Sequence, residues 1–140
     1  MTRTQRFPFV ETDVSLGEVS RLLYAPIRLG LRGRSVSVPA LLDTGSTVNV
    51  LPFEVGTRLG AVWEQQTVPI RLAGPLAHDP ARAVLLEATM GELPTVRLAF
   101  AWTRSNAVPV ILGQVNFFKE FDVCFFRSRS EFEVRLKGTI

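Results

Sequence analysis

Asp43, at the end of an apolar run, is the residue of this sequence whose neighbours best suit a catalytic carboxylate. Residues 40–42 are apolar, Asp43 follows them, and Thr44, Gly45 and Ser46 come next. The apolar residues can anchor a strand, and the glycine permits a turn that a side chain would obstruct. The two hydroxyls can orient a carboxylate, and a carboxylate held in this way can act as a general acid or base. An ordinary strand ending in an Asp-Thr-Gly turn is the alternative, because such turns favour the same residues.

A second apolar run also ends in a glycine, where Ile111 and Leu112 precede Gly113. Glycine lets two backbones approach closely, so this segment can lie beside the strand that carries Asp43. The two motifs are expected to meet in one site.

Alternating apolar residues predict the strands that position these motifs. About nine short strands are expected, at residues 24–31, 36–42, 48–51, 68–72, 83–89, 96–102, 108–112, 122–126 and 131–136. Residues 32–34 are expected to form a hairpin turn, and two short helices are expected at residues 53–59 and 114–121. This pattern predicts an all-β domain, closed or folded over on itself, at residues 24–140, preceded by an N-terminal arm at residues 1–23.

Composition excludes several classes of function. The chain has 140 residues, which fits one domain, and a net charge of +3 that is spread along it, so no nucleic-acid footprint is expected. Its single cysteine, Cys124, excludes an intrachain disulfide and is expected to be buried in a strand.

The lone histidine, His78, is expected at the surface, because no Cys/His cluster exists for it to join. No apolar run approaches the ~18 residues of a membrane span, and no signal core is present, so a cytoplasmic protein is expected.

The two motifs resemble those of the retropepsin-like aspartic proteases. That family pairs an apolar-Asp-Thr-Gly-Ser/Ala motif with an apolar-apolar-Gly motif before a short C-terminal helix. Here the first motif ends in Asp43-Thr44-Gly45-Ser46, and the second is Ile111-Leu112-Gly113. The resemblance covers roughly residues 24–136 and implies a closed acid-protease barrel, a peptide or protein substrate, and no metal or organic cofactor.

The resemblance also implies a homodimer. Aspartic proteases use two carboxylates that share one proton, and this sequence contains Asp-Thr-Gly only once. Two copies related by a two-fold axis would each supply Asp43. Thr44 would then hydrogen-bond across the dyad, and Ser46 would donate to the carboxylate, which favours its ionised form and moves activity towards acid. Terminal strands at residues 7–10 and 131–136 would interleave across the two-fold axis.

A flap over the cleft is also implied. The candidate is the loop at residues 73–82, with substrate-contacting main chain at Ala73, Gly74, Pro75 and Leu76. Thr47 and Gln114 occupy positions that form an ion pair in retroviral members, and here they can offer only a neutral hydrogen bond.

Two other interpretations compete with a peptidase. The same fold can serve as a catalytically silent peptide-binding or dimerisation module. An unrelated β fold with a structural role would leave Asp43 solvent-exposed and unpaired.

Overall fold

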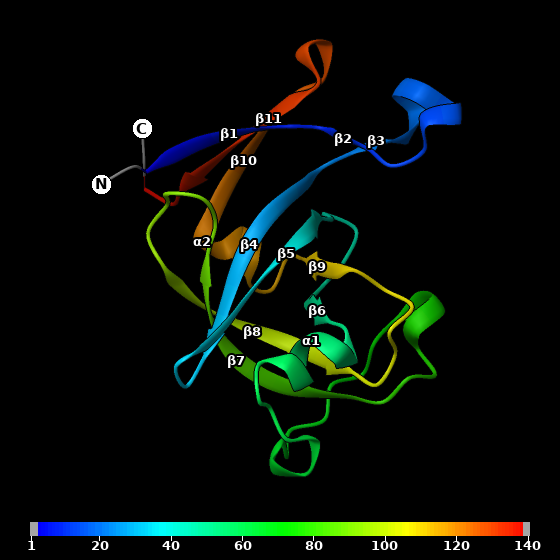
Figure 1. The fold of residues 1–140 in the computed structure, drawn as a ribbon, viewed down its shortest axis with the longest axis vertical. Coiled ribbons are helices and arrows are strands. Elements are labelled where there is room, and N and C mark those ends of the chain that lie inside the picture. The colour runs from blue at the N-terminus through cyan, green and yellow to red at the C-terminus, as the bar shows by residue number, and fades with distance from the viewer. Residues whose placement is uncertain (1–2, 139–140) are drawn as a thin grey trace.

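A closed β-barrel forms the centre of the molecule. The computed structural model describes residues 3–138, and Figure 1 shows their arrangement. In the barrel, neighbouring strands follow the order β4 (Tyr24–Leu31), β5 (Arg34–Leu42), β9 (Val110–Leu112), β6 (Asn49–Leu51), β8 (Val96–Thr103) and β7 (Ala81–Thr89). This arrangement confirms the expected closed all-β barrel.

Two smaller sheets lie outside the barrel. One has the order β1 (Thr4–Pro8), β11 (Glu131–Leu136) and β10 (Phe121–Phe126). The other pairs β2 (Val10–Glu11) with β3 (Arg21–Leu22) at the base of the 3₁₀ helix η1 (Val14–Ser20). Within residues 3–138 there are two short α-helices, α1 (Phe53–Arg58) and α2 (Phe117–Glu120), and three further 3₁₀ turns, η2 (Trp63–Gln65), η3 (Gly74–Leu76) and η4 (Arg127–Arg129).

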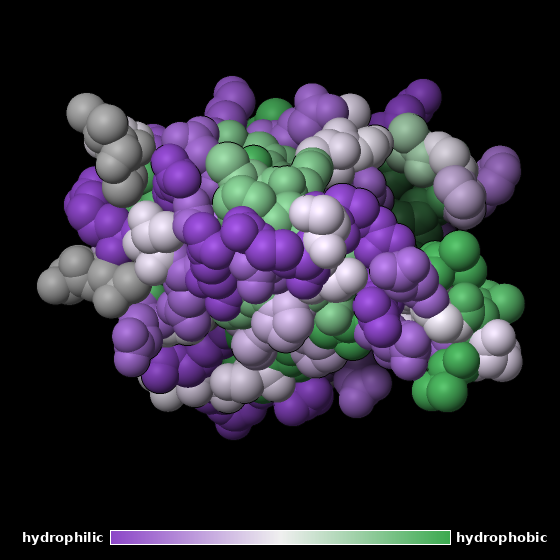
Figure 2. Space-filling view, turned by 90° about the horizontal axis from the view of Figure 1, so that it is seen from above, coloured by the Kyte–Doolittle hydropathy of each residue, from purple (hydrophilic) through white to green (hydrophobic). Residues whose placement is uncertain are grey.

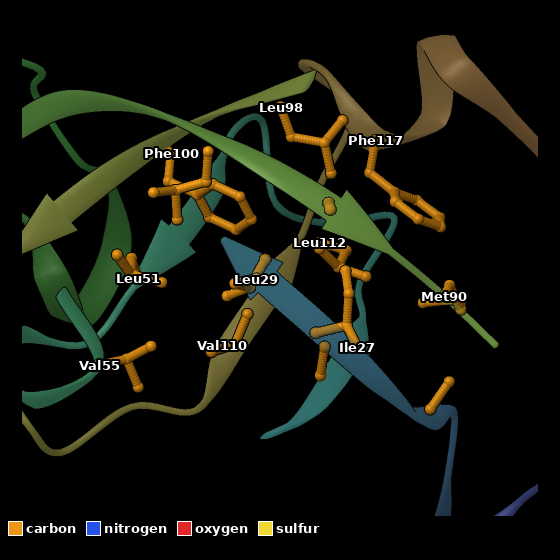
Figure 3. Close-up of a cluster of buried hydrophobic side chains, with 14 of the residues drawn as sticks. Ile27, Leu29, Leu51, Val55, Met90, Leu98, Phe100, Val110, Leu112 and Phe117 are labelled. Carbon is orange, nitrogen blue, oxygen red and sulfur yellow. The ribbon is translucent and has the colours of Figure 1, made fainter. Parts of the chain in front are cut away.

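The core fills the barrel with side chains from the inward faces of its strands. Leu29 from β4, Phe100 from β8 and Leu112 from β9 are fully buried, and Figure 3 shows them converging on one cluster. Phe117 of α2 belongs to the same cluster, so the short helix is packed against the strand end that precedes it. Burying large apolar side chains of this kind contributes about 1.5–3 kcal/mol each to the free energy of unfolding.

The predicted hairpin and first helix are confirmed, whereas the second helix is shorter than expected and one expected strand is not regular. Antiparallel β4 and β5 meet at the expected turn, and α1 falls within the expected residues 53–59. The expected helix at residues 114–121 begins only at Phe117, because the N–H groups of Gln114 and Val115 donate to the carbonyls of a neighbouring loop. Residues 68–72 form no regular strand. They pair with β7 through an isolated bridge at Pro69, and proline has no N–H to donate to a ladder.

The N-terminal segment packs against the C-terminal strands of the same chain. Strand β1 pairs antiparallel with β11, and the ring of Phe7 stacks on that of Phe132 with centroids 5.5 Å apart. Because β10 pairs with the other edge of β11, residues 131–136 have no free edge for a partner strand. The expectation that this strand interleaves across a two-fold axis is therefore wrong, whereas the expectation for residues 7–10, which begin in the edge strand β1, stays a prediction. The domain boundary at residue 23 stays a prediction.

The expectation for Cys124 is also wrong, because its side chain is exposed on β10. Cys124 stands opposite Glu133 of β11, on the outer face of the sheet. A continuous apolar run such as residues 123–126 does not reveal which of its residues face outward.

Glu133 on this outer face is almost fully buried beneath two arginines. Arg135 and Arg6 both donate hydrogen bonds to its carboxylate, Arg6 from 3.1 Å. The bond from Arg135, followed by that from Arg6, lowers the pKa of Glu133 below its ordinary value of 4.5, against the opposing effect of burial.

A pH-dependent contribution to stability follows from this lowered pKa. The contribution is complete above the ordinary carboxylate pKa and is lost as the pH falls through the lower pKa of the folded state. We expect Glu133→Gln to lower the free energy of unfolding at pH 7 and to reduce its loss between pH 7 and pH 3, measured by urea denaturation. Glu64→Gln, at an exposed glutamate, should leave both values unchanged. Equal pH dependence in Glu133→Gln and the wild type would contradict this prediction.

Candidate active site

The barrel topology brings the two sequence motifs together. Strands β5 and β9 pair in parallel, with Leu42 opposite Leu112. Asp43 comes directly after β5, and its backbone N–H donates to the carbonyl of Leu112 at 2.9 Å. Asp43 therefore lies at the end of the barrel where both apolar runs end.

A tight turn holds the Asp43 side chain. The N–H of Gly45 donates to Oδ1 of Asp43 at 2.9 Å, and the N–H of Ser46 donates to the Asp43 carbonyl at 3.1 Å. Asp43 is half-buried, while Thr44 and Gly45 are exposed. The turn thus orients one carboxylate oxygen and leaves the group open to solvent and to a partner.

The Ser46 side chain has a different partner from the one expected. Its hydroxyl donates to the Val48 carbonyl at 2.7 Å. A hydroxyl has one proton to donate, so the expected bond from Ser46 to the Asp43 carboxylate is not formed. The expectation of activity towards acid, which depended on that bond, loses its basis.

Gly113 allows the second motif to cross the first at very short range. A Cβ atom at this position would lie 2.4 Å from the Val48 carbonyl oxygen and 2.7 Å from that of Ser46. Beyond the glycine, the N–H of Gln114 donates to the Ser46 carbonyl at 2.9 Å, and Nε2 of Gln114 donates to the Thr44 carbonyl at 2.7 Å. The Gln114 side chain therefore bonds to Thr44 and not to Thr47, the partner expected from the sequence, and this bond connects it to the turn that carries Asp43.

Asn49 is a positioning residue that the sequence reasoning missed. It is fully buried in β6, and its Oδ1 accepts a hydrogen bond from the N–H of Gly113 at 2.8 Å. Its Nδ2 donates to Oδ1 of Asn116 at 3.1 Å and to the Ala99 carbonyl at 3.0 Å. The signal was an asparagine inside a run expected to be buried, since a buried amide requires partners.

A pocket of about 390 Å³ joins Asp43 to the flap candidate. Ala73, Gly74, Pro75 and Leu76, which form and adjoin the turn η3, line it. Most of the remaining wall is apolar and comprises Val48, Val50, Leu72, Val108 and Ile111, with Gly45, Ser46 and Thr47 beside the carboxylate. Of the predicted site residues, Thr44, Leu112 and Gly113 do not line the pocket.

Across residues 3–138, no group of His, Cys, Asp and Glu side chains could hold a metal ion. No helix in this part of the chain is long and apolar enough to cross a membrane. His78 is exposed, as expected.

Comparison with known proteins identifies the fold. No family model matches the sequence, and no curated protein matches it. Among solved structures, a retropepsin-like aspartic protease from Rickettsia conorii is similar over 97% of this chain and 94% of its own, with a TM-score of 0.67 and 12% identity. The retroviral protease-like domain of Ddi1 from Leishmania major is similar over 72% of this chain and 79% of its own, with a TM-score of 0.56 and 17% identity. The EIAV protease complexed with the inhibitor HBY-793 is similar over 72% of this chain and 88% of its own, with a TM-score of 0.54 and 15% identity.

The protein therefore has the retropepsin-like fold.

Proposed function

We propose that the protein is an aspartic endopeptidase that acts as a homodimer, with one Asp43 carboxylate from each copy. The proposal is carried by the position of Asp43. It follows β5 where β5 pairs with β9, and its side chain lines a pocket that η3 also lines. Because the chain has one Asp-Thr-Gly, a dyad requires a second copy.

The chemistry of such a dyad needs no metal or organic cofactor. One ionised Asp43 takes a proton from a water molecule, and the resulting hydroxide adds to the carbonyl carbon of the peptide bond. The protonated Asp43 of the second copy first donates a hydrogen bond to the carbonyl oxygen and then supplies the proton for the leaving nitrogen. The Gly45 N–H holds one carboxylate oxygen in place, and the hydrogen bond from Gln114 to Thr44 keeps the turn rigid.

The pocket suits a peptide. Its apolar wall can take an apolar side chain next to the scissile bond, while the main chain of residues 73–76 can pair with the peptide backbone. The cytoplasmic location remains a sequence-based prediction.

A silent binding module is the second candidate. The observation in its favour is that Ser46 donates to Val48 and not to the carboxylate, so one expected active-site bond is missing. The same pocket would then hold a peptide without cleaving it.

Peptide-library cleavage between pH 4 and pH 7 separates these two functions. We expect cleavage by the wild type, with a rate that rises and then falls with pH because two carboxylates share one proton, and inhibition by a pepstatin-like compound. Binding of library peptides without cleavage at any of these pH values would favour the silent module.

The main chain of residues 73–76 should become less mobile when a ligand fills the pocket. In the structure Gly74–Leu76 form a single 3₁₀ turn that follows Ala73, and Ala73, Gly74 and Pro75 are exposed. We expect slower amide hydrogen exchange at Ala73, Gly74 and Leu76 when the pepstatin-like inhibitor binds. Unchanged exchange at saturating inhibitor would remove this loop from the mechanism.

A further inference from the structure

The ribbon formed by β2, η1 and β3 ends in exposed apolar side chains. Val14, Leu16 and Val19 on η1 are 84%, 59% and 78% exposed. Figure 2 shows hydrophobic residues gathered at the right-hand end of the molecule, on the side where η1 lies in Figure 1. A contiguous exposed apolar cluster of this kind marks an interaction surface more often than an isolated exposed valine does. From here on, "the arm" means residues 10–22 only, a part of the N-terminal segment 1–23.

Hydrogen bonds hold the arm in this conformation. The buried Ser20 hydroxyl lies 2.9 Å from the Asp13 carbonyl and 2.8 Å from the Gly17 carbonyl, which share its single proton, and it accepts from the Asp13 N–H at 3.1 Å. The Asp13 carboxylate caps η1 by accepting from the N–H and hydroxyl of Ser15, and this interaction lowers the pKa of Asp13. Arg127 fixes the arm to η4 by donating to the Glu18 carbonyl at 3.3 Å. The apolar side chains are thus presented on an ordered support, which reduces the entropic cost of binding.

A complementary groove of about 710 Å³ lies at the base of the arm. Val10 of the arm contributes to one wall, and Pro26 of β4, Pro39 of β5 and Val55 of α1 contribute to the others. Apart from the hydroxyls of Thr12, Tyr24 and Ser37, its lining side chains are apolar. The groove is therefore suited to aliphatic side chains such as those at the tip of the arm.

The charges of the arm and of the groove's surroundings are also complementary. The arm has three acidic residues, Glu11, Asp13 and Glu18, against one arginine, Arg21, in a chain whose net charge is +3. Arg28 follows Pro26 by two residues on β4 and so shares its face. An acidic arm laid along the groove would have its charges near this arginine.

The geometry points to a second copy of this chain as the occupant of the groove. Because the groove lies at the base of each arm, two arms crossing a two-fold axis in opposite directions place each tip in the other copy's groove. The arm leaves the barrel beside the candidate site, since the Leu42 N–H donates to the Leu23 carbonyl at 2.9 Å and Asp43 comes next. This inference rests on the proposed function, which leaves the site incomplete without a second copy, and it replaces the terminal strands as the main dimer contact.

Sedimentation equilibrium of three variants and the wild type tests the exchange of arms. We expect the tip variant Val14→Ser/Leu16→Ser/Val19→Ser to weaken dimerisation by about 100-fold, because three apolar contacts are lost in each arm. Ser37→Glu, the groove variant, should weaken it by a similar factor through a charge placed among apolar side chains and facing an acidic arm. The control variant Val68→Ser/Leu85→Ser changes residues that are 59% and 57% exposed outside both surfaces and should dimerise like the wild type.

Mixing the tip and groove variants provides the sharper test. Neither homodimer has an intact arm facing an intact groove, whereas the heterodimer has one such contact, so the mixture should associate more tightly than either variant alone. A mixture no tighter than its components, or a tip variant that dimerises like the wild type, would overturn the inference. A wild type that stays monomeric at millimolar concentration would also overturn it.

Peptide cleavage measured on the same samples keeps the two proposals apart. Wild-type cleavage with unchanged dimerisation of the tip variant would overturn the arm exchange and leave the proposed peptidase standing. Dimerisation through the arms without cleavage by the wild type would support the arm exchange and overturn the peptidase.

Discussion

Asp43→Asn should abolish peptide cleavage, with a loss of at least about 10⁴-fold, because the substitution removes both acid–base groups of a symmetric dyad at once. Asparagine keeps the size of the side chain, and its Oδ1 can still accept the hydrogen bond from Gly45. The variant is therefore expected to fold and dimerise. Asp122→Asn, at an exposed aspartate on β10, is the matched control and should retain full activity.

Mixtures of wild type and Asp43→Asn show whether the two carboxylates act together. If each site needs two Asp43 residues, heterodimers are inactive, and an equal mixture should keep about a quarter of the activity of the same total protein. The rate should follow the square of the wild-type fraction after subunit exchange. A rate proportional to the wild-type fraction itself would mean that each chain acts alone and would contradict the dyad.

The site could be predicted from the sequence where its residues are local. The Asp43 motif and the run that ends at Gly113 are each short and carry their own signals, namely apolar residues followed by a turn-forming glycine. Their meeting requires only that β5 and β9 pair, and the structure shows that pairing. The hairpin of β4 and β5 was predictable for the same reason, since alternation and turn residues are local features.

The remaining details depend on contacts between segments far apart in the sequence. Asn49 bonds to Gly113, and no local pattern identifies such a partner. The Ser46 hydroxyl could reach either a carboxylate or a carbonyl, and the path of the chain at Val48 decides between them. The exposure of Val14 and Val19 was equally unpredictable, because periodicity reports that apolar residues share a face and not whether that face is covered.

Gly113→Ala should be the most disruptive small substitution in the candidate site. The added Cβ would lie 2.4 Å from the carbonyl oxygen of Val48 and 2.7 Å from that of Ser46, and both obstructing atoms belong to the backbone. Relieving the overlap must separate the two loops and stretch the hydrogen bonds that connect them, from the Gly113 N–H to Asn49 and from the Gln114 N–H to Ser46. We expect the free energy of unfolding to fall by about 3 kcal/mol or more.

Gly30→Ala provides the matched comparison for this prediction. A Cβ at Gly30 in β4 would make only ordinary contacts, the nearest at 3.6 Å to the Arg34 carbonyl, so alanine should be tolerated within about 0.5 kcal/mol. Urea denaturation of both variants measures the difference, and peptide cleavage by the folded fraction of Gly113→Ala shows whether the turn at Asp43 has moved. Equal stability of the two variants would mean that the loops around Gly113 can separate freely, which would contradict the close crossing on which the position of Asp43 depends.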